Sequence, residues 1–285
     1  MPPKADSDDF LARFREIVSD PLNLLIEREP SAGVVEDGLV MLHNGIRVPV
    51  AGDASYYGDF SNILVINRGV HEPLEEYIFQ ELLPRLPEAP CMLELGAYWG
   101  HYSMWLKKAR PQARVILVEP VEEYLEAGRQ NFARNGVEGE FLRDFVGDGR
   151  FQVDAFLKDR GIETVSVLHA DIQGFEVEML QGAAETLRRR RADYVLVSTH
   201  SKLKHRGVRA ALTEFGYRIE VSSDFKNHTT AWDGSIFATN PEIPPLFSGF
   251  RPMGRTDICA SSSRELIEYV RAVDQARRIG RAPKI

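Results

Sequence analysis

The sequence predicts an α/β fold in which one mostly parallel, seven-stranded sheet carries helices on both faces. Two observations predict it. From residue 91 onward, apolar segments of strand length alternate with segments of helical periodicity. The last two strand-like segments, 217–223 and 233–240, follow each other without a helix between them. We therefore expect the last strand to run antiparallel, and right-handed crossovers make the parallel part doubly wound.

Residues 1–88 are expected to form an N-terminal extension that packs beside or over the main domain. Helical spacing of apolar residues predicts a helix over 9–18, and 38–50 predicts two short strands around a His-Asn-Gly turn. The run SNILVINRG (61–69) predicts another short strand. Residues 72–83 predict an amphipathic helix that stops near two prolines.

Residues 89–240 are expected to form the main domain. Its predicted strands lie at 91–95, 114–119, 139–146, 164–171 and 193–200, and its predicted helices at 100–109, 121–134, 153–159, 175–190 and near 205–215. With the final strand pair, this is the layout of the Rossmann-like class I methyltransferase fold. Residues 241–285 are expected to form a proline-rich tail with a helix over 263–278, which packs on the domain, contributes to a homodimer or hangs free.

Composition fits a globular protein and narrows the classes of function. The 285 residues are 44% hydrophobic and carry a formal net charge of −7, so a nucleic-acid partner, which usually needs a basic face, is not expected. No apolar run approaches the roughly 20 residues of a membrane span, so no membrane partner is expected. Two cysteines and a polar, acidic start, unlike a secretory signal, indicate a cytoplasmic protein.

The end of the first strand carries a nucleotide-binding signature. Ligands of open α/β sheets bind beyond the carboxyl ends of the strands, and this end reads LELGAYWGHYS (93–103). Gly96 permits a tight turn and close approach of a ligand, and Gly100 lets the next helix begin near the strand. Glu119 ends the second strand, where an acid accepts hydrogen bonds from both ribose hydroxyls.

The same loop discriminates between nucleotide cofactors. A dinucleotide loop usually reads G-x-G-x-x-G because it holds a pyrophosphate, and here no glycine lies two residues after Gly96. S-adenosylmethionine has no phosphate, and its cationic amino-acid end suits Glu94. We therefore expect S-adenosylmethionine rather than a nicotinamide cofactor. Other side chains expected near it are Tyr98 and Tyr102 on the loop, Asp144 near the third strand tip, and Asp171.

These segments resemble the FkbM family of S-adenosylmethionine-dependent methyltransferases. The matching pieces, within roughly residues 60–240, are RGVHEPLEE (68–76), LELGAYWGHYS (93–103), VEP (118–120) and HADIQGFEVEMLQGA (169–183). The resemblance implies O-methylation of a hydroxyl group on a small molecule or sugar. It also implies that the 93–103 loop, including Ala97 and Ser103, and Glu119 hold the cofactor. His169 and Gln173 depart from the family pattern, which usually has Lys and Glu there.

Topology gathers a second group of residues at the same edge of the sheet. Asp171 ends the fourth strand, His200 ends the fifth, and the 224–233 connection brings His228 there if the sixth strand is parallel. Methyl transfer to oxygen needs the hydroxyl proton removed, so His200 or His228 is expected as general base. Alternatively, Asp171, His200 and His228 bind a divalent metal ion that activates the hydroxyl.

Structural roles remain open for each of these residues. Asp171 can cap the following helix, and His200 can bond the backbone at a strand end. Glu176 is expected to belong to that helix, with a weaker expectation that it faces the site. The aromatic segment 56–60 is either acceptor-facing or part of a linker. Two other functions also remain open: N- or protein methylation, and cofactor binding without catalysis.

Overall fold

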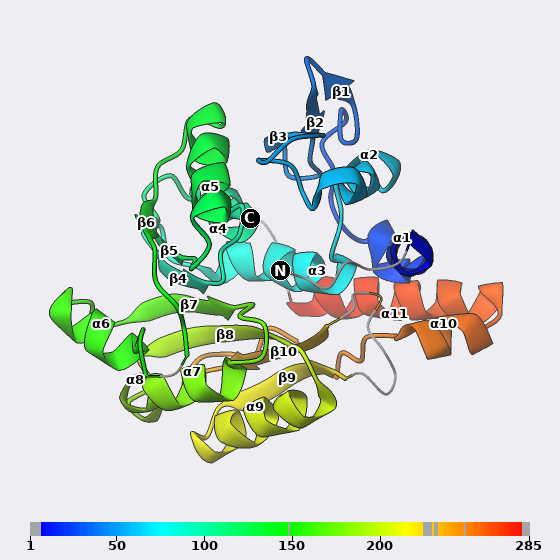
Figure 1. Ribbon diagram of the computed structural model, residues 1–285. Helices are drawn as coiled ribbons and strands as arrows, with labels where there is room; N and C mark the ends of the chain where they lie inside the picture. The colour runs from blue at the N-terminus through cyan, green and yellow to red at the C-terminus, as the bar shows by residue number, and fades with distance from the viewer. Residues whose placement is uncertain (1–6, 148, 225–229, 231–232, 248, 281–285) are drawn as a thin grey trace.

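The computed structural model describes residues 7–147, 149–224, 230, 233–247 and 249–280. Its main sheet contains β4 (Cys91–Leu95), β5 (Arg114–Val118), β6 (Glu140–Leu142), β7 (Val165–Ala170), β8 (Ala192–Thr199), β9 (Arg218–Ser223) and β10 (Gly234–Thr239). The strand order is β6-β5-β4-β7-β8-β10-β9 (Figure 1). Strands β4 to β8 pair in parallel, whereas β10 runs antiparallel to both β8 and β9. The predicted seven-stranded sheet with an antiparallel last strand is confirmed.

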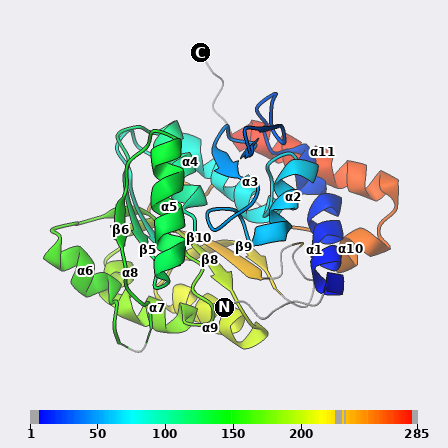
Figure 2. The same cartoon turned by 45° about the horizontal axis from the view of Figure 1, so that its top comes forward.

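Helices cover both faces of this sheet (Figures 1 and 2). One face carries α3 (Pro73–Leu82), α4 (His101–Ala109) and α5 (Glu122–Arg134), and the other carries α6 (Val153–Asp159), α7 (Glu176–Gly182), α8 (Ala184–Arg188) and α9 (Lys202–Glu214). Successive residues of a strand point to opposite faces. Accordingly, Met92 joins the core under α3 and α4, whereas Leu93 and Leu95 join the core under α6 to α9. Burial on both faces explains why these strands are apolar throughout.

The described part of the N-terminal extension that precedes α3, residues 7–72, packs on the face that carries α3 and α4. It contains α1 (Ser7–Ser19), a short 3₁₀ helix at Pro21–Leu24, the antiparallel strands β1 (Val35–Glu36), β2 (Leu39–Met41) and β3 (Arg47–Pro49), a 3₁₀ turn at Gly58–Ser61, and α2 (Asn62–Ile66). Ile17, Val40 and Ile63 from these elements are buried in one core with Met92 of the sheet. The extension and this face of the main sheet therefore share a hydrophobic core.

The strand predicted within 61–69 is wrong, because residues 62–66 form α2. A short apolar run has no periodicity that separates a strand from a buried helical turn. In α2, Ile63 and Leu64 are buried while Ile66 is 61% exposed. The predicted helix at 175–190 is also divided at Ala183 into α7 and α8.

The C-terminal segment forms two helices, α10 (Arg255–Ala260) and α11 (Ser263–Gly280), and the sequence predicted the second of these. Helix α11 packs on the extension and on α3. Val273 is buried there, and Arg277 pairs with Glu81 at 3.0 Å and with Glu27. Within the described residues, none of the helices combines the length and apolar character needed to cross a membrane.

Strands β4 and β7 approach each other closely where both end. The Asp171 N–H donates to the Leu95 carbonyl at 2.9 Å, and a Cβ atom on Gly96 would lie 1.8 Å from the Asp171 carbonyl oxygen. Gly96 also has a φ of +73°, in the left-handed region that favours glycine. The backbone after β7 thus packs closely against Gly96, which leaves no room for a side chain at this position.

We predict that Gly96→Ala destabilises the protein far more than Gly161→Ala. Gly161 has a similar φ of +62°, but nothing lies within 4 Å of a Cβ atom there. Alanine at 161 should therefore cost only the backbone strain, about 1–2 kcal/mol. At 96 the steric overlap adds to this strain, and the loss should exceed about 4 kcal/mol. Urea unfolding measures both, and equal losses would contradict the proposed steric cause.

Candidate functional site

The carboxyl ends of β7 and β8 bring Asp171 and His200 together, as the topology predicted. His200 Nε2 lies 3.1 Å from Asp171 Oδ1 and 3.6 Å from Asp233 Oδ1, which precedes β10. His200 Nδ1 lies 2.5 Å from Glu176 Oε1. His228 lies outside the described residues. The centre of the site is therefore one imidazole surrounded by three carboxylates.

This arrangement determines the charge of His200. Burial disfavours the charged imidazole, but the hydrogen bonds to Asp171 and Glu176 outweigh burial and raise the pKa of His200 to about 11. This pKa favours the protonated imidazole at neutral pH, in which both ring nitrogens donate, and Nε2 also lies 2.9 Å from the side-chain nitrogen of Gln173. A general base or a metal ligand needs a ring nitrogen without a proton, so these two expected roles of His200 remain predictions. The described part of the site thus gives no support to the metal ion predicted there.

Glu176 takes a more direct part than the sequence suggested. It is the first residue of α7 and fully buried, and its Oε1 accepts the Gly174 N–H at 2.8 Å as well as contacting His200. The carboxylate thus fixes the turn after β7 and the ring of His200 together. In the sequence, Glu176 follows Asp171 closely in the connection between a strand and a helix. This position was the feature of the sequence that placed it near the site.

The N-terminal extension contributes a second group of side chains to this edge. The Tyr57 ring stacks on the Tyr98 ring, with 4.7 Å between the ring centroids. The backbone N–H of Tyr57 donates to the Tyr98 hydroxyl at 2.9 Å. Burial, and then the negative charge of Asp171, raise the pKa of Tyr57 well above its usual value. Arg13 of α1, which the sequence gave no reason to select, donates to the Tyr56 hydroxyl at 3.3 Å. The aromatic segment at 56–60 is therefore part of the candidate site.

Glu72, just before α3, is the other acidic group near Asp171. Its Oε2 accepts the Tyr102 hydroxyl at 2.9 Å. Burial is the main cause that raises the pKa of Glu72 to about 7, and the charges of Glu75 and Asp171 add to it. Burial likewise raises the pKa of Asp233 to about 6. Two carboxyl groups in the site thus have pKa values close to neutral pH.

The predicted cofactor loop is held by backbone hydrogen bonds and by Glu119. The N–H groups of Gly96 and Ala97 donate to the Val118 carbonyl at 2.8 and 3.1 Å. The two oxygens of Glu119 each accept one backbone N–H, from Tyr98 and from Val121, both at 3.0 Å. Each carboxylate oxygen retains a further acceptor position, so the chemistry of this group fits a ribose diol.

Glu94 and Gly100, two other predicted cofactor residues, also have contacts within the protein. Glu94 is 2% exposed, and its Oε2 accepts the Ser103 N–H at 3.1 Å near the start of α4. Gly100 is the left-handed residue before α4, and a Cβ atom there would meet Phe132 at 2.8 Å. Both residues therefore support the loop from inside the protein.

Asp144 lies apart from this group, after β6. Its Oδ1 accepts the Phe145 N–H at 2.7 Å and lies 3.8 Å from Arg150. The Phe145 ring meets Phe175 edge-on at 4.9 Å. This partly exposed aromatic pair is the neighbour that an adenine at the tip of β6 would meet.

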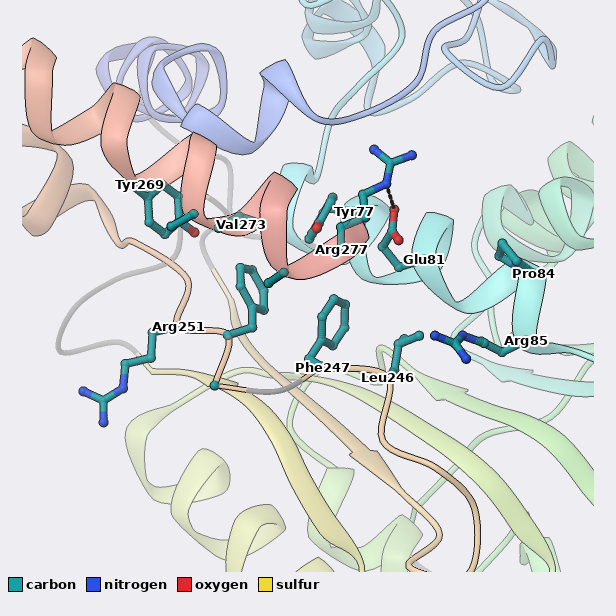
Figure 3. Close-up of a pocket in the computed structure, with 14 residues that line it drawn as sticks. Tyr77, Glu81, Pro84, Arg85, Leu246, Phe247, Arg251, Tyr269, Val273 and Arg277 are labelled. Carbon is teal, nitrogen blue, oxygen red and sulfur yellow. Dashed lines mark ion pairs between the residues drawn. The ribbon is translucent and has the colours of Figure 1, made fainter. Parts of the chain in front are cut away.

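A separate cavity of about 250 Å³ lies between α3, α11 and the 246–251 segment (Figure 3). Tyr77, Phe247 and Tyr269 line it, and the Glu81–Arg277 ion pair crosses its rim. None of the predicted site residues is among the residues lining it. The cavity is therefore not part of the site at the strand ends.

Comparison with known proteins agrees with the fold. Residues 150–219 match the family model described as the methyltransferase FkbM domain. Among curated proteins, none matches this sequence. The structure is similar to precorrin-6y C5,15-methyltransferase from Geobacter metallireducens GS-15, with 16% identity over 57% of this chain and 87% of that one, at a TM-score of 0.43.

Two further solved structures show a similar degree of likeness. Methyltransferase FkbM from Methylobacillus flagellatus KT has 18% identity, covering 53% of this chain and 44% of that one, at a TM-score of 0.42. TrmK from M. capricolum, solved with S-adenosyl-homocysteine, has 10% identity, covering 70% of this chain and 83% of that one, also at 0.42. These likenesses are distant, and the fold assignment rests on the strand order.

The strand order with antiparallel β10, together with the family match, defines a class I S-adenosylmethionine-dependent methyltransferase. Residues 150–219, which contain α6 to α9, match the model of the methyltransferase FkbM domain, and over these residues the match confirms the resemblance that the sequence indicated.

We predict that His200 stays protonated across the neutral range. Its folded pKa of about 11 lies above the usual value of 6.5, so its contribution to stability is complete below about pH 6.5 and is lost as the pH rises towards 11. In ¹⁵N NMR, its imidazole should show two protonated nitrogens at pH 8. Asp171→Asn should lower this pKa measurably. His205, whose pKa burial lowers, serves as internal reference, and a His200 titration near 6.5 would contradict the assignment.

Proposed function

We propose that this chain methylates a hydroxyl group of a small molecule or sugar. The observation that supports the proposal is that two partly buried carboxyl groups, Asp233 beside His200 and Glu72 near Asp171, have pKa values of about 6 and about 7, near neutral pH. A general base works best when its pKa is close to the working pH. Asp233 and Glu72 therefore suit a reaction that needs a proton acceptor.

The chemistry assigns a role to each group. S-adenosylmethionine supplies a methyl group on a sulfonium sulfur and leaves as S-adenosylhomocysteine. Asp233 accepts the proton of the attacking hydroxyl, so that the oxygen gains the methyl group as its O–H bond breaks. The His200 imidazolium stays protonated, and its charge stabilises Asp171 and ionised Asp233. Glu176 holds the imidazolium in place from the buried side.

The proposed cofactor site lies at the carboxyl ends of the strands. Glu119 would accept the ribose hydroxyls with the acceptor positions its backbone partners leave open. Phe145 would contact the adenine near Asp144. Tyr57, stacked on Tyr98 and close to Asp171, would face the acceptor. The acceptor is proposed to be neither nucleic acid nor a membrane component, because the net charge of −7 favours no anionic partner.

We predict that S-adenosylhomocysteine binds with micromolar affinity, about −8 kcal/mol, and that NAD does not bind. Glu119→Gln should weaken binding roughly 10- to 100-fold, because two hydroxyl groups lose a charged acceptor. Glu126→Gln, on the exposed face of α5, should leave affinity unchanged. Calorimetric titration measures all three proteins. Binding of NAD alone would overturn the cofactor assignment, and unchanged affinity in Glu119→Gln would remove its role.

We predict that methylation of a hydroxylated acceptor rises with pH through about 6, as Asp233 loses its proton. Asp233→Asn should lower kcat by roughly 10²- to 10⁴-fold and remove this rise. Transfer of a labelled methyl group to panels of alcohols, sugars and amines, sorted by methylated atom, identifies the acceptor class. Products methylated only on nitrogen would contradict the proposed hydroxyl acceptor. Cofactor binding without any transfer would indicate a non-catalytic module.

A further inference from the structure

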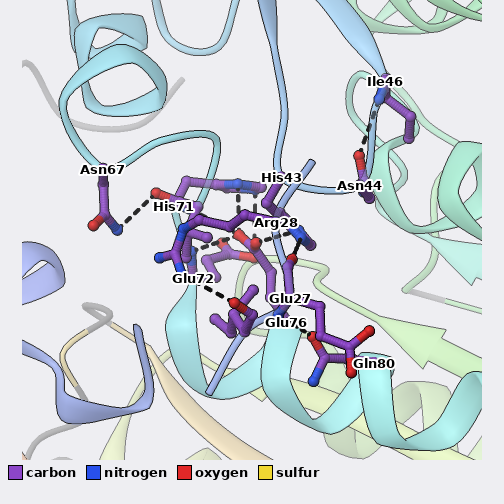
Figure 4. A network of polar contacts seen from close by, with 12 residues as sticks. Glu27, Arg28, His43, Asn44, Ile46, Asn67, His71, Glu72, Glu76 and Gln80 are labelled. Carbon is purple, nitrogen blue, oxygen red and sulfur yellow. Dashed lines mark hydrogen bonds and ion pairs between the residues drawn. The ribbon is translucent and has the colours of Figure 1, made fainter. Parts of the chain in front are cut away.

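His43, His71 and Glu76 form a buried polar network where the extension meets the main domain (Figure 4), and the ring of His101 lies next to both histidines. His43 comes from the turn between β2 and β3, Glu76 from the first turn of α3, and His101 from the start of α4. Their exposed fractions are 2%, 0% and 2%. One ligand atom from each residue can be chosen so that all three lie within 4.8 Å of one another.

The surrounding contacts orient Glu76 towards this cluster. Its Oε1 accepts the backbone N–H groups of His71 and Glu72 at 2.8 and 2.9 Å and contacts His71 Nδ1 at 2.8 Å. The other oxygen, Oε2, faces His43 Nε2 at 2.7 Å. One oxygen is thus used by the protein, and the second is directed at the imidazole nitrogen.

His43 has the support typical of a metal-binding histidine. Its Nδ1 lies 3.3 Å from the backbone carbonyl of Glu27, to which Nδ1 can donate a proton while Nε2 binds a metal ion. Histidine ligands usually donate their second ring N–H to a carbonyl or carboxylate in this way. The remaining nitrogen, Nε2, then points to the centre of the cluster.

His101 provides a second, independent observation in favour of an ion at this cluster. Among the residues that the structure describes, neither of its ring nitrogens has a hydrogen-bond partner, although the side chain is almost fully buried. Its neighbours are the rings of His43, His71 and Trp105, at centroid distances of 6.1, 4.7 and 5.9 Å. A buried polar group without a partner is costly, and an ion would satisfy it.

We propose that His43, Glu76 and His101 bind a divalent first-row transition-metal ion. Two imidazoles and one carboxylate suit zinc and its neighbours, whereas magnesium and calcium prefer oxygen ligands alone. Ligands on a tetrahedral ion with bonds of about 2.0–2.1 Å lie roughly 3.3 Å apart. His43 Nε2 and Glu76 Oε2 therefore need to separate by about 0.6 Å from their 2.7 Å contact.

The location gives the ion a structural role. Its three ligands tie the β2–β3 turn to α3 and α4, and so tie the extension to the main domain. Glu72, the residue just before α3, accepts the Tyr102 hydroxyl and belongs to the candidate site described above. The metal site itself does not depend on the proposed methyl acceptor.

The test begins with the full-length protein and the metal alone. Elemental analysis of the purified protein should give close to one equivalent of zinc or a related metal. After removal of the metal with a chelator, Zn²⁺ should raise the Tm by several degrees. Co²⁺ should give the visible absorption of a tetrahedral nitrogen and oxygen site. These readouts do not use methyl transfer, so they fail or succeed independently of the proposed function.

Two variants locate the site. His101→Asn should lower metal affinity at least 100-fold and remove the cobalt spectrum. His205→Gln replaces another buried histidine, bonded to Thr199 and Ser222, and should leave metal binding unchanged. If His101→Asn does not fold, the cobalt spectrum of the wild-type protein still tests whether the protein binds a metal ion. Wild-type protein without stoichiometric metal and without a response to Zn²⁺ or Co²⁺ would overturn the proposal and leave a buried ion-pair network.

Discussion

The position of α3 depends on three glutamates at or just before its start, two of them buried, because a buried carboxylate is costly unless it is paired and hydrogen-bonded. Glu75 accepts hydrogen bonds from Ser198 of β8 and Ser235 of β10, at 2.7 and 2.8 Å. Glu76 contacts His43 and His71, and Glu72 accepts the Tyr102 hydroxyl. These partners come from the extension, α4 and the sheet. Only one placement of α3 satisfies all of them, and that placement joins the two parts of the chain.

This constraint extends to the strand ends. Glu72 is close enough to Asp171 for the two negative charges to affect each other, and the same edge holds His200 and Asp233. Charges interact more strongly in a partly buried site than in water. The single imidazolium of His200 therefore determines which of the surrounding carboxylates can hold a proton. The site is preorganised by the packing of α3 as much as by its own residues.

Local patterns in the sequence predicted most elements of the main domain. Strand β4 occupies 91–95 and helix α6 occupies 153–159, as predicted, because each pattern has one clear period. The pattern failed at 61–69, where a short apolar run became α2, and at 175–190, where Ala183 separates two helices. In both places packing against neighbouring segments decided the structure, and periodicity carries no information about such contacts.

By itself the sequence determined the α/β class, the antiparallel last strand and the meeting of Asp171 with His200, because parallel strands end at one edge of a sheet. Only the tertiary structure decided the charge of His200, since that charge depends on Glu176 and Asp233, which approach it in space from other segments. The same holds for the part played by the N-terminal extension. Its tyrosines and His43 reach the main domain through packing between segments distant in the chain, which no local pattern records.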